Sequence, residues 1–351
     1  MISTTDIFPP SPHEEQPPLR SAPGLLQGHT GMAIVHYLIG RHIDNHRFSE
    51  SGLALLNEVS DVISSVEDLS YAHGLAGIGW GIEWLVQQGL LADTDTDEVL
   101  SDVDDLLYKS TLFGKRSSIS LHHGTTGLLA YFHKRYTSRN PGSSHIKNLY
   151  HHECISLLID DIATQQTGQR YPFSEGLFLA ELGGMMAHLS AVSKINIVTT
   201  ENILYDAVAA TDHFLQQLCD ARELPAVPGD GDYYLRALFL AACYEIAGRN
   251  TGHATWQLHA SVYMETLLQR LETQPAMHSS TDPFRQLAVY SLVSLVLPSC
   301  ANLAVRQQDI CLQTQPPHCL AGGSGLIAIS RLAAAAPELT GNWADIFIAC
   351  V

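Results

Sequence analysis

Apolar and amphipathic stretches alternate along most of this chain. Seven stretches are apolar on nearly every face and start near residues 28, 77, 124, 181, 233, 284 and 322. In the segments between them, apolar residues recur every three or four positions, as expected of a helix with one buried side. These amphipathic segments cover residues 48–63, 97–108, 146–165, 200–219 and 253–271. No run shows the sustained two-residue alternation of a β-strand, so the pattern predicts an all-α fold.

The alternation also predicts how the helices are arranged. A helix that is apolar on most of its surface must be enclosed, whereas an amphipathic helix covers it with one face and leaves the other in water. Repeated pairs of an enclosed and a covering helix most economically close into two concentric rings. We therefore expect an α/α toroid of about six to seven helical hairpins.

A glycine motif introduces three of the apolar stretches. Gly-x-x-Gly begins at Gly28, Gly74 and Gly124, and a looser copy surrounds Gly322, so the unit recurs about every 50 residues in the first half. Glycine permits a positive φ angle and close backbone approach, which suits a tight turn before a helix. In the predicted toroid, all these turns gather at one end of the central cavity.

Composition excludes several classes of protein. The net charge of −17, with 46% hydrophobic residues, describes a chain able to bury a large core but repelled by phosphate backbones and anionic membranes. A basic peptide or a neutral ligand suits this charge better. We expect no membrane span and no signal peptide, and hence a cytoplasmic protein. The 7 Cys include no Cys-x-x-Cys pair and predict no disulfide framework.

The N-terminal composition differs from the rest. Five prolines and two glutamates among residues 1–22 cannot bury apolar surface or sustain a helix, so we predict a flexible arm there. Residues 23–351 contain no comparable linker and form a single domain in this interpretation.

Polar residues beside the glycine turns are the candidates for chemistry. His73 and His123 each precede the first glycine of a copy, and His122 stands beside His123, so these imidazoles suit proton transfer if they face the cavity. The alternative is that each histidine only caps its own turn. The candidate substrate-binding residues are His73 and three polar groups before and within the helix near residue 233: Asp232, Tyr233 and Arg236.

Two further chemistries remain open. His318 and Cys319 are adjacent and supply two potential zinc ligands, with a third drawn from Cys243, Cys300, Cys311 or a distant His. Alternatively, Glu181 and Asp232 on opposite sides of a cavity would form the acid and base of a glycan-acting enzyme. Simple helix capping and turn formation also account for these carboxylates.

Three segments resemble the lanthionine synthetase C-like family. They are residues 24–34 (GLLQGHTGMAI), 74–85 (GLAGIGWGIEWL) and 121–129 (LHHGTTGLL), and the likeness extends to about Pro337. The resemblance implies an α/α toroid that cyclises ribosomally made peptides by adding a Cys thiol to a dehydrated Ser or Thr. It also implies a precursor peptide as partner, with a dehydratase or other modifying enzyme, and His123 as the acid/base residue.

The zinc motif of that family is not intact in this sequence. The family takes zinc ligands from a Cys before a late turn and from a Cys-His pair before the last turn. Aligning Gly322 and Gly325 with the repeat puts Leu320-Ala321 at the pair, and aligning Cys319 and Gly322 puts Pro317-His318 there. We therefore retain two hypotheses from the resemblance: a cyclase, with or without zinc, and a zinc-less scaffold that binds a basic leader peptide.

Overall fold

The computed structural model describes residues 22–138, 145–166, 171–221, 232–273, 282–314, 316–337 and 343–351. Within these ranges the regular structure is helical and contains no strand, which confirms the predicted all-α class. All but the last residue of the predicted N-terminal arm, 1–22, lies outside the described residues.

Seven helices correspond to the apolar stretches, and each begins within five residues of its predicted start. We call them the inner helices: α2 (His29–Ile43), α4 (Leu75–Gln87), α7 (Thr125–Tyr136), α9 (Gly176–Val192), α11 (Tyr233–Thr251), α13 (Pro283–Val296) and α15 (Ser324–Ala335).

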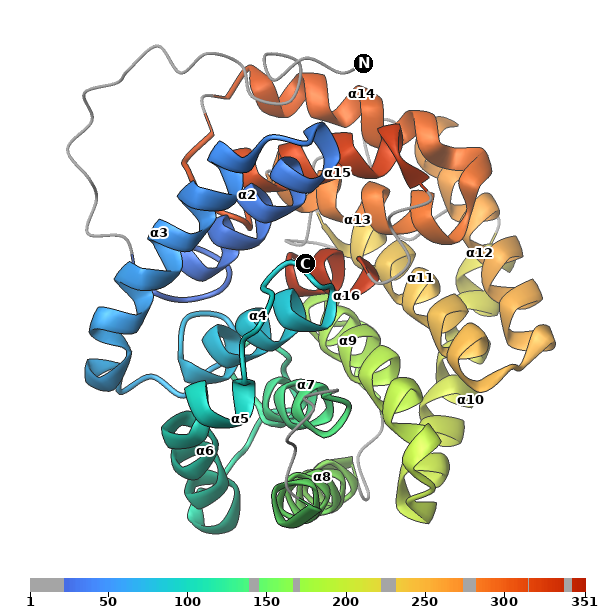
Figure 1. The fold of residues 1–351 in the computed structure, drawn as a ribbon. Helices are drawn as coiled ribbons and strands as arrows, with labels where there is room; N and C mark the ends of the chain where they lie inside the picture. The colour runs from blue at the N-terminus through green and yellow to red at the C-terminus, as the bar shows by residue number, and fades with distance from the viewer. Residues whose placement is uncertain are drawn as a thin grey trace.

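Six long helices follow inner helices along the chain and lie outside them in Figure 1. These outer helices are α3 (His46–Val62), α6 (Ser101–Phe113), α8 (His145–Gln166), α10 (Val198–Asp220), α12 (Ala254–Thr273) and α14 (Ala301–Leu312). Two shorter helices complete the main elements: α5 (Thr96–Val99), before α6, and α16 (Ala344–Ala349), after α15.

The inner helices make a closed series of contacts. Each contacts the next along the chain, from α2 through α4, α7, α9, α11 and α13 to α15, and α15 contacts α2 again. In Figure 1 they surround a central space in which α16 lies. Enclosure explains their composition: α11 buries fourteen residues with polar Glu245 among them, whereas outer α3 buries only Gly52 and Val59.

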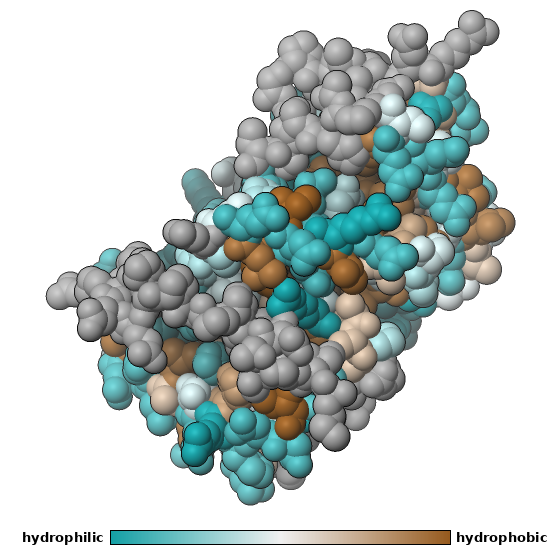
Figure 2. All heavy atoms as spheres, turned by 90° about the horizontal axis from the view of Figure 1, so that it is seen from above, coloured by the Kyte–Doolittle hydropathy of each residue, from teal (hydrophilic) through white to brown (hydrophobic). Residues whose placement is uncertain are grey.

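The outer surface is mainly polar. In Figure 2 hydrophilic residues predominate on the visible face, with apolar residues as separate patches between them. This is the expected exterior for amphipathic outer helices that carry much of the net charge of −17.

One segment is apolar enough to be compared with a membrane span. By length and composition alone, Gly176–Ile195, which comprises α9 and the turn after it, would be able to cross a membrane. It contains Glu181 and His188, and 67% of its most apolar window is buried inside the molecule. Packing in the protein core therefore accounts for its hydropathy.

Glycine turns fix the N-terminal ends of α2, α4 and α7. The N-cap residues Gly28, Gly74 and Gly124 have negative φ, so of the two properties of glycine considered from sequence, the positive φ is not used at these positions. Glycine is needed at these positions because of close backbone approach: a Cβ atom on any of them would lie under 3.0 Å from the carbonyl oxygen six residues earlier. The second glycines of the three copies, Gly31, Gly77 and Gly127, meet the same obstacle.

Polar side chains link the opposite ends of the inner helices. Gln87 of α4 donates to the carbonyl of Lys134 at the end of α7 over 2.8 Å, and Arg249 of α11 donates to that of Val296 in α13 over 2.7 Å. The last carbonyls of a helix lack backbone partners within it, and these two side chains supply a donor to each. They hold neighbouring C-terminal ends side by side.

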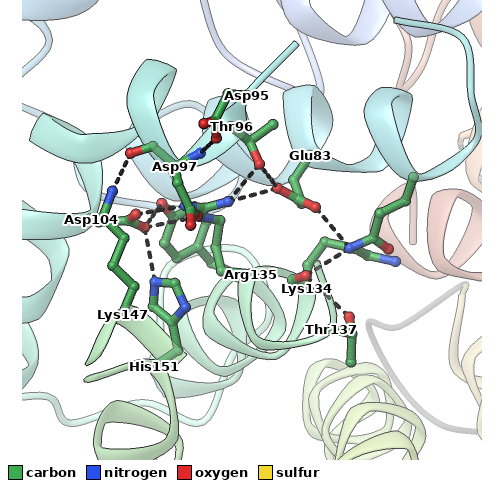
Figure 3. Close-up of polar contacts among 12 residues, drawn as sticks. Glu83, Asp95, Thr96, Asp97, Asp104, Lys134, Arg135, Thr137, Lys147 and His151 are labelled. Carbon is green, nitrogen blue, oxygen red and sulfur yellow. Dashed lines mark hydrogen bonds and ion pairs between the residues drawn. The ribbon is translucent and has the colours of Figure 1, made fainter. Parts of the chain in front are cut away.

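A buried ionic network joins the inner helices α4 and α7 to the outer layer (Figure 3). The fully buried guanidinium of Arg135 lies 2.7 Å from Glu83, 2.9 Å from Asp97 and 2.8 Å from Asp104. Burial acts to raise the pKa of Asp104, but hydrogen bonds from His151 and Arg135 and the charge of Arg135 outweigh it and lower that pKa well below its usual range. The network is an internal cross-link, with the cation inaccessible to solvent.

Replacing Arg135 should strongly destabilise the fold. Arg135→Met leaves the buried Glu83 and Asp97 and the half-buried Asp104 without their cation, and we expect the free energy of unfolding to fall by about 3–5 kcal/mol. Urea denaturation followed by circular dichroism measures this loss. Arg306→Met on exposed α14 is the control and should change stability by less than about 0.5 kcal/mol. Equal effects of the two substitutions would contradict a central role for the network.

The glycine turns give a second test. Gly77→Ala places a Cβ against the carbonyl of Tyr71, and forced backbone movement should cost about 2 kcal/mol or more. Gly184→Ala in α9 is a matched control, since its Cβ would make only ordinary contact with Leu121, at 3.6 Å. Thermal unfolding of both variants separates steric conflict from helix propensity, because the control should keep or slightly raise the melting temperature.

Candidate functional site

The glycine turns lie together at one end of the inner helices, which we call the turn end. Backbone hydrogen bonds connect four successive turns: Ala321 N–H donates to Leu26, Leu26 N–H to Ala72, and Ala72 N–H to His122, over 2.8, 3.0 and 3.1 Å. The predicted gathering of these turns is therefore confirmed. Residues about 50 positions apart in the sequence become neighbours here.

Three predicted histidines meet at the turn end. The ring centroids of His73 and His123 are 5.7 Å apart, and those of His122 and His123 are 6.2 Å apart. His123 is exposed, whereas His73 and His122 are half-buried. The exposed imidazole is available to a ligand, and the other two limit the side from which a ligand approaches it.

His122 is held by a different part of the chain. Its Nε2–H donates to the backbone carbonyl of Ala349, at the end of α16, over 2.8 Å. Burial lowers the pKa of His122; the bond to Ala349 acts in the opposite direction, and the charges of His123, His73 and Arg285 lower the pKa further. His122 is thus a neutral hydrogen-bond donor to a peptide carbonyl.

The predicted substrate-binding residues of α11 lie at the same end of the inner series. Asp232 forms an ion pair with Arg285 of α13. The positive charge of Arg285 is one of the causes that lower the pKa of His122. The Tyr233 hydroxyl donates to the carbonyl of Phe173, just before α9, over 2.8 Å. Arg236 lies one turn further along α11, where its N–H donates to the carbonyl of Asp232. Asp232 and Tyr233 therefore connect neighbouring helices, and their role in substrate binding stays a prediction.

His318 and Cys319 lie in the turn before α15. His318 is exposed, with Nδ1 3.3 Å from the Ser324 hydroxyl, and its ring is 6.1 Å from that of His36. The buried Cys319 thiol donates to the carbonyl of Ala321 over 3.0 Å. Burial raises the pKa of Cys319, which disfavours the thiolate that a metal requires.

The donor set does not fit a zinc site. Among the residues that the structure describes, no group of three His, Cys, Asp or Glu side chains is placed to hold a metal ion. Of the other cysteines considered, Cys243 is fully buried in α11, Cys311 is buried in α14, and Cys300 is half-buried after α13. The position expected to hold the family's first Cys, before α11, lies in 222–231, outside the described residues, and that stretch contains no Cys or His.

The last turn has a register that differs from both alignments considered from sequence. Ser324 N–H donates to the carbonyl of Pro317, seven residues earlier, as Leu75 N–H does to Asp68 and Thr125 N–H to Ser118. Gly323 is therefore the equivalent of Gly74 and Gly124. Ala321-Gly322 then occupies the position of the family's Cys-His pair, and His318 lies further upstream. Neither Ala321 nor Gly322 has a side chain that can ligate zinc.

Glu181 lies beside a pocket. The pocket, of about 210 Å³, is lined by residues that include Ser118, Gln165, Tyr171, Phe178 and Glu181, and burial raises the pKa of that carboxyl. Asp232 is not among the pocket residues and is paired with Arg285. The structure therefore gives no support to Glu181 and Asp232 as an acid and base that share one cavity.

Two parts of the turn end were not predicted. Arg285 follows Asp282-Pro283, a signal of a helix start only, and its position near His122 depends on packing between distant helices. Residues 343–351 form a short apolar run that resembles any core segment. Nothing in their local sequence indicates the contact of Ala349 with His122.

Comparisons with known proteins add no family assignment. No protein-family model matches this sequence, and a search of curated proteins finds no match.

The pKa of His122 tests the geometry at the turn end. We expect NMR titration to give a pKa below the ordinary value of 6.5, and Arg285→Leu to raise it because a nearby positive charge is removed. Because folding lowers the pKa of His122, this residue contributes to the stability of the native state at pH values above its unfolded pKa. The contribution is lost as the pH falls through the lower native pKa. Arg306→Leu should leave the titration unchanged. An unaltered pKa of His122 in Arg285→Leu would show that the charge of Arg285 on α13 does not act on this histidine.

Proposed function

We propose that the described helices form an α/α toroid and that this chain is a lanthionine synthetase C-like protein that binds a precursor peptide at the turn end. The proposal rests on one observation above all: His122 donates to a main-chain carbonyl while the exposed His123 lies beside it. The closed series of inner helices supports the toroid. The net charge of −17 supports a basic leader on that peptide.

The proposed reaction adds a cysteine thiol of the peptide to a dehydrated Ser or Thr. His123 takes the S–H proton as general base, the sulfur forms a bond to the β-carbon, and the double bond shifts to the enolate. The proton returns to the α-carbon, so the ring forms with no change in mass and no oxidant. A positioned imidazole contributes about 10²–10⁴-fold to such a proton transfer. No step uses a metal, because the donor set does not fit one.

The test uses a synthetic peptide with one dehydroalanine, a cysteine a few residues further on and a basic leader. Ring closure consumes the free thiol without changing the mass of the peptide. After alkylation, mass spectrometry therefore distinguishes the open peptide, which gains mass, from the closed ring, which does not. We expect acceleration over buffer, and His123→Ala to reduce it by about 10²-fold or more. His213→Ala, on the exposed side of α10, is the control and should keep the wild-type rate. An unchanged rate in His123→Ala overturns this role.

A non-catalytic scaffold is the second candidate, supported by Ala321-Gly322 at the position of the family's Cys-His pair. In that case the chain presents the precursor to a dehydratase or another modifying enzyme. The same peptide, labelled with a fluorophore, distinguishes the two functions. Binding without ring closure supports the scaffold, and neither binding nor closure rejects both.

A further inference from the structure

The segment after α15 departs from the pattern of the other hairpins. Each of the six preceding inner helices is followed by a long outer helix, but residues 343–351, with α16, enter the space between the inner helices (Figure 1). The inner series closes through direct contacts that do not involve this segment. It therefore lies inside the closed series as an added element.

The segment is buried as a bound peptide would be. Ile346, Phe347, Ile348 and Ala349 are each at most 2% exposed, and α16 packs against α13. Burial of this much apolar surface is the main force holding the segment in place. Any competitor must supply comparable apolar side chains.

Two polar contacts fix its direction. The Asp345 carboxylate lies 3.5 Å from the ammonium group of Lys134, near the C-terminal end of α7. The Ala349 carbonyl accepts from His122, before the N-terminal end of the same helix. The segment thus runs antiparallel to α7 and reaches the histidines at the turn end.

The contacts also show which features of a peptide are recognised. His122 binds a main-chain oxygen, which every peptide offers, and Lys134 selects a carboxylate. The Asp345 side chain is 37% exposed, so this anchor is accessible from solvent. Cys350 follows the His122 contact and is half-buried; burial raises the pKa of its thiol, with a further contribution from Cys319.

We propose that the space between the inner helices is a peptide-binding site and that residues 343–351 are its internal occupant. A peptide with an acidic residue followed by apolar residues, spaced as in Asp345–Ala349, displaces them and brings its own chain to His73, His122 and His123. This rests on the proposed function in assigning the site to peptides, but it does not depend on ring chemistry. It makes the segment an autoinhibitory element of that site.

Alkylation of Cys350 in the full chain measures displacement. Iodoacetamide modification, located by mass spectrometry, should be slow in the native protein and at least tenfold faster in Phe347→Ala. The fully buried Cys154 of α8 is the internal control for unfolding and should stay protected in both proteins. Parallel modification of Cys154 and Cys350, or no acceleration at Cys350, overturns the proposal.

His122 variants test the polar contact separately. His122→Leu removes the donor to Ala349 and should also accelerate Cys350 modification, whereas His122→Gln retains an N–H donor and should partly restore protection. Equal rates in the two variants would show that the contact does not hold the segment.

Competition tests the binding site directly. A synthetic peptide of residues 343–351 with Ser in place of Cys350, added to the Phe347→Ala chain, should accelerate Cys350 modification to a saturating rate. A scrambled peptide of the same composition should have no effect, and acceleration by both peptides would overturn the proposal. This result is independent of the precursor experiment: self-peptide competition without precursor binding rejects only the proposed function, and precursor binding without competition rejects only this inference.

Discussion

The close approach of each glycine turn to the carbonyl six residues earlier is the constraint on which this molecule depends. A side chain at Gly28, Gly74 or Gly124 would occupy the position of that oxygen, and the turn would have to open. Tight turns allow the backbone of each to bond to the next, from Ala321 to His122. Because the turns are bonded in series, α15, α2, α4 and α7 present their N-terminal ends together, and the histidines follow.

Charged groups have different roles in the buried ionic network and at the turn end. Between α4, α7 and the outer helices, Arg135 neutralises carboxylates in a site closed to water, where charge serves cohesion. At the turn end, helix N-termini carry partial positive charge and Arg285 adds a full one. His122 is neutral there and donates to a carbonyl instead of holding a proton. Such an environment suits uncharged main-chain groups better than a second cation.

The last turn changes what the resemblance to lanthionine synthetase C-like proteins implies. Ala321 and Gly322 occupy the positions of two expected ligands, and the buried Cys319 thiol is engaged by a carbonyl. What the turn end retains is a set of imidazoles and a backbone-binding donor beside a buried segment of the chain. The proposed peptide binding therefore rests on these contacts and does not depend on whether ring formation follows.

The sequence by itself determined the helices, their alternation and the gathering of the turns, because glycine spacing and three-to-four-residue periodicity are local signals. It missed α14, whose buried side includes Gln307 and Gln308 where apolar residues are expected; these amides bond to Pro283 and Ser330 on neighbouring helices. The register of the last turn was ambiguous because Gly322, Gly323 and Gly325 offer several alignments.

Only the tertiary structure decided the rest. The entry of residues 343–351 into the interior and the pairing of Asp232 with Arg285 join residues tens to hundreds of positions apart. Such contacts depend on how all the helices pack, and no local pattern in the chain encodes them.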